Sequence, residues 1–271
     1  MARKAYVGIE NTSEKIKKIY VGVNGVAHKV KKIYVGVNNI ARCCFSSIGD
    51  LKPIFQNNDW ETIIAACEDG VVPDTWEIGD SKTINGDEWV IIGKNHDDLF
   101  TANTGYNKGS NKAALTLQKR HTYAEYKYYY NQTKSVEGGW RDCYLRNTHL
   151  LQVFAELPVE IQTAVKSVRK LSDNHGPTIS ATEDKLFVPS ETEVFGTAQD
   201  SLANQGAQYD WYKNVNNRIK TREGTSDTTS WYLRSTVTKS DDCYCLVSYR
   251  GETSYTFAGD PSTALAPCFC L

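Results

Sequence analysis

Apolar and polar residues alternate at the start of the chain in a pattern that recurs every fourteen residues. Tyr-Val-Gly followed by Ile or Val occupies residues 6–9, 20–23 and 34–37. Alternation with a period of two predicts strands. Asn24-Gly25 is a strong hairpin signal because both residues tolerate positive φ, and Asn38-Asn39 is a weaker one. A lone hairpin is marginal in water, so the units must stack on each other or on a partner. We therefore expect residues 1–45 to form an all-β hairpin module for attachment or oligomerisation, with a trimer as the favoured assembly.

The pattern changes after residues 46–58, where Ser, Gly and Pro predict a linker. Asp59 and Gly70 suit the two ends of a helix at Trp60–Glu68. Alternation predicts strands at 77–80, 88–93 and 185–189, and helical spacing predicts helices over 150–154 and 158–171. From 231 to 271, short apolar segments between Gly and Pro predict strands alone, and the echo of 143–148 in 231–236 predicts two similar strands in one sheet. The pattern thus predicts an α+β domain at 59–271.

Composition and charge narrow the function classes. The net charge of −1 creates no global field that favours nucleic acid or a membrane surface. No run of 18 apolar residues and no signal peptide is visible. We therefore expect that the chain is synthesised in the bacterial cytoplasm and that it does not insert into a membrane. Basic residues concentrate in 1–45, which fits either a solvated strand face or contact with an acidic partner.

Candidate chemistry is sparse. Cys243 and Cys245, like Cys268 and Cys270, are separated by one residue, whereas structural zinc sites mostly use two. This spacing favours buried core cysteines, so we predict no metal and no cofactor, with a four-thiolate zinc site as the alternative. His96-Asp97-Asp98 fits a polar loop after a strand better than a metal or acid–base site. The tyrosine-rich segment 123–130 fits a half-buried strand or subunit contact better than stacking on sugars or bases.

The residues near the end of the chain predict a binding surface. If 243–249 is a strand, Cys245 and Val247 share a core face, and the opposite face and the next turn are exposed. That exposed set is rich in Tyr and Ser with one Arg, a composition typical of adaptable binding surfaces. The alternative is an ordinary strand with one buried face. The candidate ligand-binding residues, with the first two at the margin, are Val237, Asp242, Leu246, Ser248, Tyr249, Arg250, Ser254, Tyr255 and Phe257.

The same segment resembles a known family. It is similar to C-type-lectin-fold domains related to formylglycine-generating enzymes and, more narrowly, to the variable proteins diversified by retroelements in bacteria and their phages. The positions that match are Trp231, Leu233, Arg234, Ser235, Cys245, Val247, Gly251, Ala258, Pro267, Phe269, Cys270 and Leu271. Weaker matches extend the resemblance back to about residue 50, among them Trp89–Gly93, Trp140, Leu145-Arg146 and Asp184–Phe187. Ala266 departs from the family, where Arg is common.

The resemblance implies a C-type-lectin-like domain of two helices and a loop-rich β sheet. It implies a non-enzymatic adhesin that displays a diversifiable surface to a host-cell surface protein or glycan. The hairpin units also resemble N-terminal segments of phage tail and baseplate adhesins, which implies attachment to such proteins through residues 1–45 and a final location in the virion tail. Two alternatives remain open. One is an oxidase-like or metal-dependent enzyme on the same fold, and the other is a purely structural tail component without an exposed aromatic patch in the last forty residues.

Overall fold

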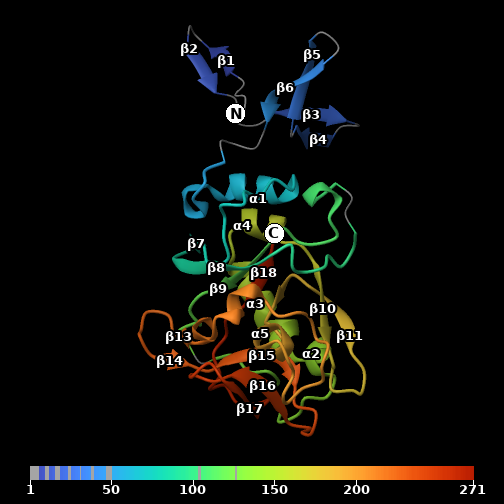
Figure 1. Ribbon diagram of the computed structural model, residues 1–271, viewed down its shortest axis with the longest axis vertical. Helices are drawn as coiled ribbons and strands as arrows, with labels where there is room; N and C mark the ends of the chain where they lie inside the picture. Colours follow the sequence, from blue (N-terminus) through green and yellow to red (C-terminus); the bar gives the residue numbers. More distant parts are fainter. Residues whose placement is uncertain are drawn as a thin grey trace.

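The computed structural model describes residues 6–9, 12–15, 19–23, 26–30, 32–37, 40–46, 51–102, 105–125 and 127–271. Within them, helices and small antiparallel sheets are mixed, so the α+β class is confirmed (Figure 1). The helices are α1 (Trp60–Glu68), α2 (Gly139–Asp142), α3 (Leu150–Glu156), α4 (Val159–Ala164) and α5 (Glu191–Phe195), with short helical turns η1 (Phe55–Asn57), η2 (Asn107–Gly109), η3 (Leu145–His149), η4 (Asp210–Lys213) and η5 (Val215–Arg218). None of the helices in the described ranges combines the length and apolar character needed to cross a bilayer.

The fourteen-residue repeats form three separate hairpins, drawn in blue in Figure 1. Their strands are β1 (Tyr6–Ile9), β2 (Thr12–Lys15), β3 (Tyr20–Val23), β4 (Val26–Lys29), β5 (Lys32–Val37) and β6 (Ile40–Ser46). Val23 pairs with Val26 and Val37 pairs with Ile40. The strand predictions are therefore confirmed, whereas the predicted turns Asn24-Gly25 and Asn38-Asn39 lie outside the described residues.

A five-stranded antiparallel sheet forms the centre of the domain, in the order β12-β18-β9-β8-β7. Its strands are β7 (Ser81–Ile84), β8 (Asp87–Lys94), β9 (Leu115–Lys119), β12 (Leu186–Phe187) and β18 (Cys268–Cys270). The rings of Trp89 and Phe269 meet at 4.9 Å between centroids on this sheet. The helix predicted at Trp60–Glu68 is confirmed, and the Asp59 carboxylate caps it by accepting the Thr62 N–H at 2.7 Å.

The second half of the predicted linker 46–58 packs as part of the domain. Phe55 is buried and meets the Trp76 ring edge-on at 5.2 Å. The buried Asn58 amide accepts the Lys52 N–H at 2.8 Å and donates to the Ile54 carbonyl at 2.9 Å. These side-chain bonds replace the backbone bonds that a short turn cannot make, and they fix this segment against the core.

Several sequence predictions of secondary structure are wrong. Residues 77–80 form a turn in which Asp80 N–H bonds the Glu77 carbonyl at 3.1 Å, and the strand begins only at β7. The helical spacing predicted over 158–171 ends at Ala164, because residues from Val168 on pair with a neighbouring strand. The predicted strand at 143–148 is instead the helical turn η3. In the second case, pairing of β10 with a strand further along the chain overrides the local helical preference.

The remaining strands form one three-stranded sheet, β15-β16-β17, and two hairpins. They are β10 (Val168–Ser172), β11 (Ser180–Asp184), β13 (Lys220–Thr221), β14 (Thr228–Thr229), β15 (Trp231–Thr236), β16 (Cys243–Val247) and β17 (Thr253–Phe257). Figure 1 shows β15–β17 at one end of the molecule and α1 toward the other. The prediction of strands without helix from 231 onward is confirmed.

Four charged side chains from different elements meet inside the core, and we call Asp97, Lys170, Glu193 and Arg234 the buried ion network. Lys170 Nζ lies 2.6 Å from Asp97 Oδ1 and 2.7 Å from Glu193 Oε1. Arg234 grips Glu193 with two nitrogens, at 2.5 and 2.9 Å. All four residues are at most 4% exposed, so the two acids and two bases neutralise each other where water cannot. The network ties β15 to α5, β10 and the loop after β8.

Candidate ligand-binding surface

β16 is the central strand of the C-terminal sheet and is buried on both faces. Cys245 and Val247 lie in the core, as predicted. Leu246, on the opposite face, is only 5% exposed, so its predicted exposure is wrong. The reason is that β16 has a neighbour on each side and aromatic rings above it: Tyr244 stacks on Tyr130 at 4.7 Å and on Tyr232 at 5.0 Å. Because its side chains are buried on both faces, β16 supports the strand beside it but does not itself contribute to a ligand-binding surface.

β17 is the edge strand, and it carries the exposed aromatic residues. Tyr255 pairs with Cys245 and Phe257 pairs with Cys243, yet the two rings are 57% and 46% exposed. Their predicted exposure is confirmed. The Lys134 ammonium lies 5.0 Å from the Phe257 ring centroid. Ser254, directly before Tyr255 in sequence, is half-buried.

The turn from β16 to β17 is held by the side chain of Ser248. Its hydroxyl accepts the Arg250 N–H at 3.3 Å and the Glu252 N–H at 3.2 Å. Gly251 has φ +80°, and a Cβ there would lie 3.0 Å from Ile219 Cγ1. Ser248 therefore orders the turn from within and is only half-exposed, which differs from its predicted position on the outward face.

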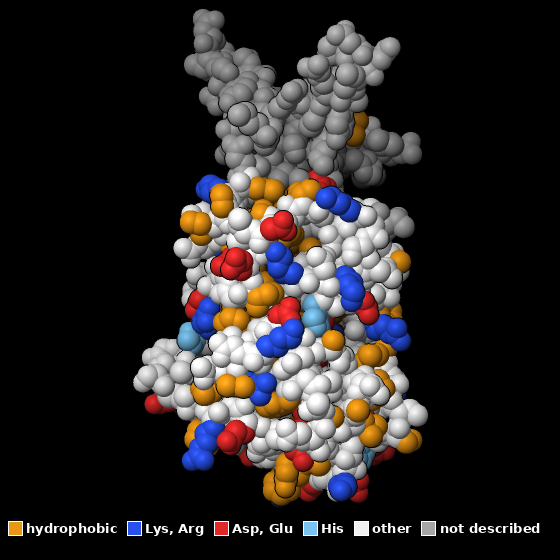
Figure 2. All heavy atoms as spheres, viewed as in Figure 1, with side chains coloured by type: hydrophobic (Ala, Val, Ile, Leu, Met, Phe, Trp, Pro, Cys, Tyr) orange, Lys and Arg blue, Asp and Glu red, His pale blue; other side chains and the backbone are white. Residues whose placement is uncertain are grey.

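Tyr249 and Arg250 project from this turn. Tyr249 is 48% exposed, and the Arg250 guanidinium lies 5.2 Å from its ring centroid. The exposed residues Val215 and Ile219 on the neighbouring η5 segment are close to Gly251, and sequence reasoning missed both. We call Tyr249, Arg250, Ser254, Tyr255 and Phe257 the C-terminal surface. Figure 2 shows hydrophobic side chains exposed among charged ones at this end of the molecule.

The two predicted margin residues lie in the connection between β15 and β16. Val237 is 8% exposed and its N–H bonds the Cys243 carbonyl at 3.1 Å, so it belongs to the core and not to the margin. The Asp242 carboxylate accepts bonds from the Ser240 hydroxyl at 2.6 Å and the Cys243 thiol at 3.3 Å. The Ser240 bond is the main reason that the pKa of Asp242 lies below its usual value.

A hollow of about 390 Å³ lies beside Tyr249 and Tyr255. Leu246 forms part of its lining, and every other described residue there carries a hydroxyl group. Apart from the two tyrosines and Ser254, these are Thr228, Thr229, Ser230, Thr256, Ser262 and Thr263. Sequence reasoning missed this lining, although the Thr-Ser-Asp-Thr-Thr-Ser run at 225–230, directly before β15, was a visible signal.

The four cysteines of the closely spaced pairs lie in two different sheets and are all buried. Cys243 and Cys245 belong to β16, and Cys268 and Cys270 belong to β18. Burial raises the pKa of each of these thiols, because a thiolate loses its hydration in the core. Among the described residues, no group of three or more His, Cys, Asp and Glu side chains is arranged to hold a metal ion.

His96-Asp97-Asp98 does not form a solvated polar loop, so that interpretation is wrong for its middle residue. Asp97 is buried, bonded to Lys170 and to the Tyr209 hydroxyl, and the His96 ring stacks on Tyr209 at 4.0 Å. Burial alone raises the pKa of Asp97, but the Lys170 ammonium outweighs this effect and holds it well below the ordinary value. The carboxylate therefore stays charged as part of the buried ion network.

The tyrosine-rich segment mostly faces inward. Tyr128 and Tyr130 are buried, and Tyr129 stacks on Tyr144 at 5.3 Å. The described part of this segment contains no strand, which differs from the prediction, while Tyr126 lies outside the described residues. Tyr130 donates to the Arg234 carbonyl at 3.1 Å and so supports β15 from below. Tyr130 therefore packs against the sheet β15-β16-β17 and stabilises it.

Comparison with known proteins gives one family. The model of a domain of unknown function (DUF6273) matches residues 111–271, more than half of the chain. The match covers β9 through β18 and includes the whole C-terminal surface. No curated protein and no solved structure matches the chain.

Proposed function

Given that the chain belongs to the DUF6273 family, a domain family of unknown function, we propose that it is a non-enzymatic, receptor-binding adhesin. The observation that carries the proposal is the contrast within one hairpin. Tyr249, Tyr255 and Phe257 are about half exposed, while every residue of β16 beneath them is buried. Rigid aromatic rings offer contact area at low entropic cost, and Arg250 and the nearby hydroxyl groups add adaptable polar contacts.

The finer parts of the proposal rest on the sequence resemblance. We propose a C-type-lectin-like domain whose C-terminal surface is diversified by a retroelement, displayed at the tail of a phage or prophage. In this proposal residues 1–45 dock the protein onto tail or baseplate proteins and form a trimer. Several copies on one particle would then convert weak single contacts into avidity. A near-copy of the final coding segment beside a reverse transcriptase gene, differing at adenines, is the genomic observation that tests the diversification.

The two alternatives have less support. An oxidase-like mechanism needs a thiolate nucleophile, whereas burial raises the pKa of Cys268 and Cys270 and keeps them protonated. A purely structural tail component predicts no exposed aromatic patch near the end of the chain, whereas Tyr255 and Phe257 are exposed.

The adhesin proposal is tested with the fluorescently labelled full chain on a panel of intact bacterial cells and on a bacterial glycan array. We expect binding to at least one of these surfaces and a loss of about tenfold or more in the double variant Tyr255→Ser/Phe257→Ser, because interface aromatics carry much of the binding energy. The matched control is Ile54→Ser/Val159→Ser, which removes two exposed apolar side chains elsewhere. A chain that binds nothing in the panel, or a control that loses binding equally, contradicts the proposal.

A further inference from the structure

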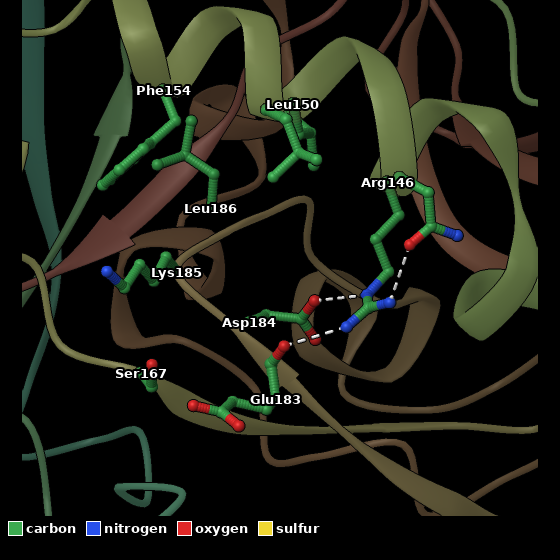
Figure 3. A pocket seen from close by; sticks show the side chains of 10 residues that line it. Arg146, Leu150, Phe154, Ser167, Glu183, Asp184, Lys185 and Leu186 are labelled. Atoms are coloured by element: carbon green, nitrogen blue, oxygen red, sulfur yellow. Dashed lines mark hydrogen bonds and ion pairs between the residues drawn. The ribbon is translucent and has the colours of Figure 1, made fainter.

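A second pocket, of about 370 Å³, lies outside the C-terminal surface and is the size of a small-molecule site (about 300–1,000 Å³). It is formed by η3, α3, β11 and β12. Figure 3 shows Leu150, Phe154 and Leu186 along one side and Arg146, Asp184 and Glu183 along the other. The pocket is thus amphipathic, with one apolar wall and one polar wall.

Much of the polar wall is already satisfied within the protein. Asp184 accepts bonds from Arg146 Nε at 2.6 Å, from Thr182 Oγ1 at 2.5 Å and from Trp140 Nε1 at 3.2 Å. The other Arg146 nitrogens donate to the Arg141 carbonyl, the Asn147 side chain and the Glu183 carbonyl. These groups shape the pocket but have few bonds left to offer a ligand.

Three polar groups of the lining remain available. Among the described residues, the Glu183 carboxylate, the Lys185 ammonium and the Ser167 hydroxyl have no hydrogen-bond or ion-pair partner. Lys185 Nζ lies 5.3 Å from the Phe154 ring centroid, so its charge sits next to the apolar wall. The pocket therefore presents one anion, one cation and one hydroxyl beside an apolar wall.

We infer that this pocket binds a free α-amino acid with a large apolar side chain. The side chain would pack on Leu150, Phe154 and Leu186, the ammonium group would pair with Glu183, and the carboxylate would pair with Lys185. Charge-assisted bonds at both ends of a small ligand give orientation, and the apolar wall gives affinity. The site lies on other elements than the C-terminal surface, so it does not depend on the adhesin proposal.

Isothermal titration calorimetry of the full chain with L-phenylalanine and L-leucine tests the inference. We expect binding, weakened about tenfold by Glu183→Gln and about tenfold by Lys185→Gln, the loss that one charge-assisted bond represents. N-acetyl-L-phenylalanine and L-phenylalaninamide, which lack the ammonium and the carboxylate respectively, should show similar losses. Both substituted residues are exposed, so circular dichroism should show an unchanged fold in the variants.

The matched controls are Glu160→Gln and Lys239→Gln, which change the same charges at exposed positions outside the pocket, and Tyr255→Ser/Phe257→Ser, which changes the C-terminal surface. All three should bind phenylalanine as the native chain does. The inference is overturned if no amino acid of the pair binds at about 10 mM. It is also overturned if the N-acetyl and amide compounds bind as tightly as phenylalanine, or if the controls weaken binding as much as the pocket variants.

Discussion

β16 and β17 are hydrogen-bonded neighbours of equal length, but their side chains differ in exposure to solvent. Each residue of β16 is buried, whereas Tyr255 and Phe257 on β17 are about half exposed. The difference follows from position, since β16 has a strand on both sides, whereas among the described strands β17 pairs with β16 alone. A protein that must keep its fold while its contacts change needs this division: one strand fixed by packing, the next open to substitution.

The comparison extends to charge. The guanidinium of Arg234 on β15 is fully buried and donates to four residues in the core, while Arg250 in the turn after β16 is exposed beside Tyr249. A buried charge without its partners is costly, and an exposed charge is solvated wherever it points. The same residue type is thus structural at one position and replaceable at the other.

Arg234→Met should produce the largest effect. It removes one of the two cations that hold the buried carboxylate of Glu193, which then keeps Lys170 and the Ser190 N–H as partners. Breaking such a buried pair costs about 3–5 kcal/mol of unfolding free energy. Urea-induced unfolding measures the loss. Arg250→Met is the matched control and should change stability by less than about 0.5 kcal/mol. Equal losses in the two variants would remove the distinction between the buried network and the exposed turn.

Acidification should have the second-largest effect, because it weakens the buried ion network and lowers the unfolding free energy. Burial alone would raise the pKa of Glu193, but the charges of Arg234 and Lys170 outweigh burial and lower this pKa. The pKa of Asp97 is likewise lowered, because the charge of Lys170 outweighs burial there. Because the folded pKa lies below the unfolded one, the stabilisation is complete above the unfolded values of 4.5 and 3.8 and is lost as the pH falls below them. Unfolding free energies measured from about pH 6 to pH 3 should therefore fall below about pH 4. A flat profile contradicts the role of the network.

Tyr255→Ser/Phe257→Ser should have the smallest effect on stability, within about 0.5 kcal/mol of the native chain, because both rings are largely solvated. Thermal unfolding by calorimetry checks this, and the variant should follow the acid profile of the native chain. A loss of several kcal/mol would show that β17 is part of the packed core and that its side chains are not free to vary.

The sequence predicts the elements that local pattern controls. The repeats at 6–37, the cap at Asp59 and the strands after residue 231 all carry their own turn or capping signals, and the structure contains them. Val168 and Leu171 have helical spacing but lie in β10, because pairing with β11 is a long-range interaction that the local pattern does not contain.

For the candidate ligand-binding surface, too, some features were predictable from the local sequence and others were not. Alternation along β16 identifies its two faces, and the exposure of Tyr255 and Phe257 was predicted from the end of that strand and the turn expected after it. The burial of Leu246 was not, because Leu246 pairs with Tyr232 on one side and Ser254 on the other, and the local pattern does not contain this pairing between strands. Val237 is likewise buried where its N–H bonds the Cys243 carbonyl of β16. The burial of the loop residue Asp97 was also missed, since its partners Lys170 and Tyr209 are far along the chain.

The buried ion network also constrains how this chain reaches its native state. Lys170 joins Asp97 across 73 positions, and Arg234 joins Glu193 across 41. Loops of this length must close before the charges can neutralise each other, and contacts between distant segments slow folding. Before β15 docks, the Glu193 carboxylate lacks its bidentate ion pair with Arg234 while the core around it loses water. We therefore expect the closing of this network to be a late and slow event in folding, completed when the C-terminal sheet docks.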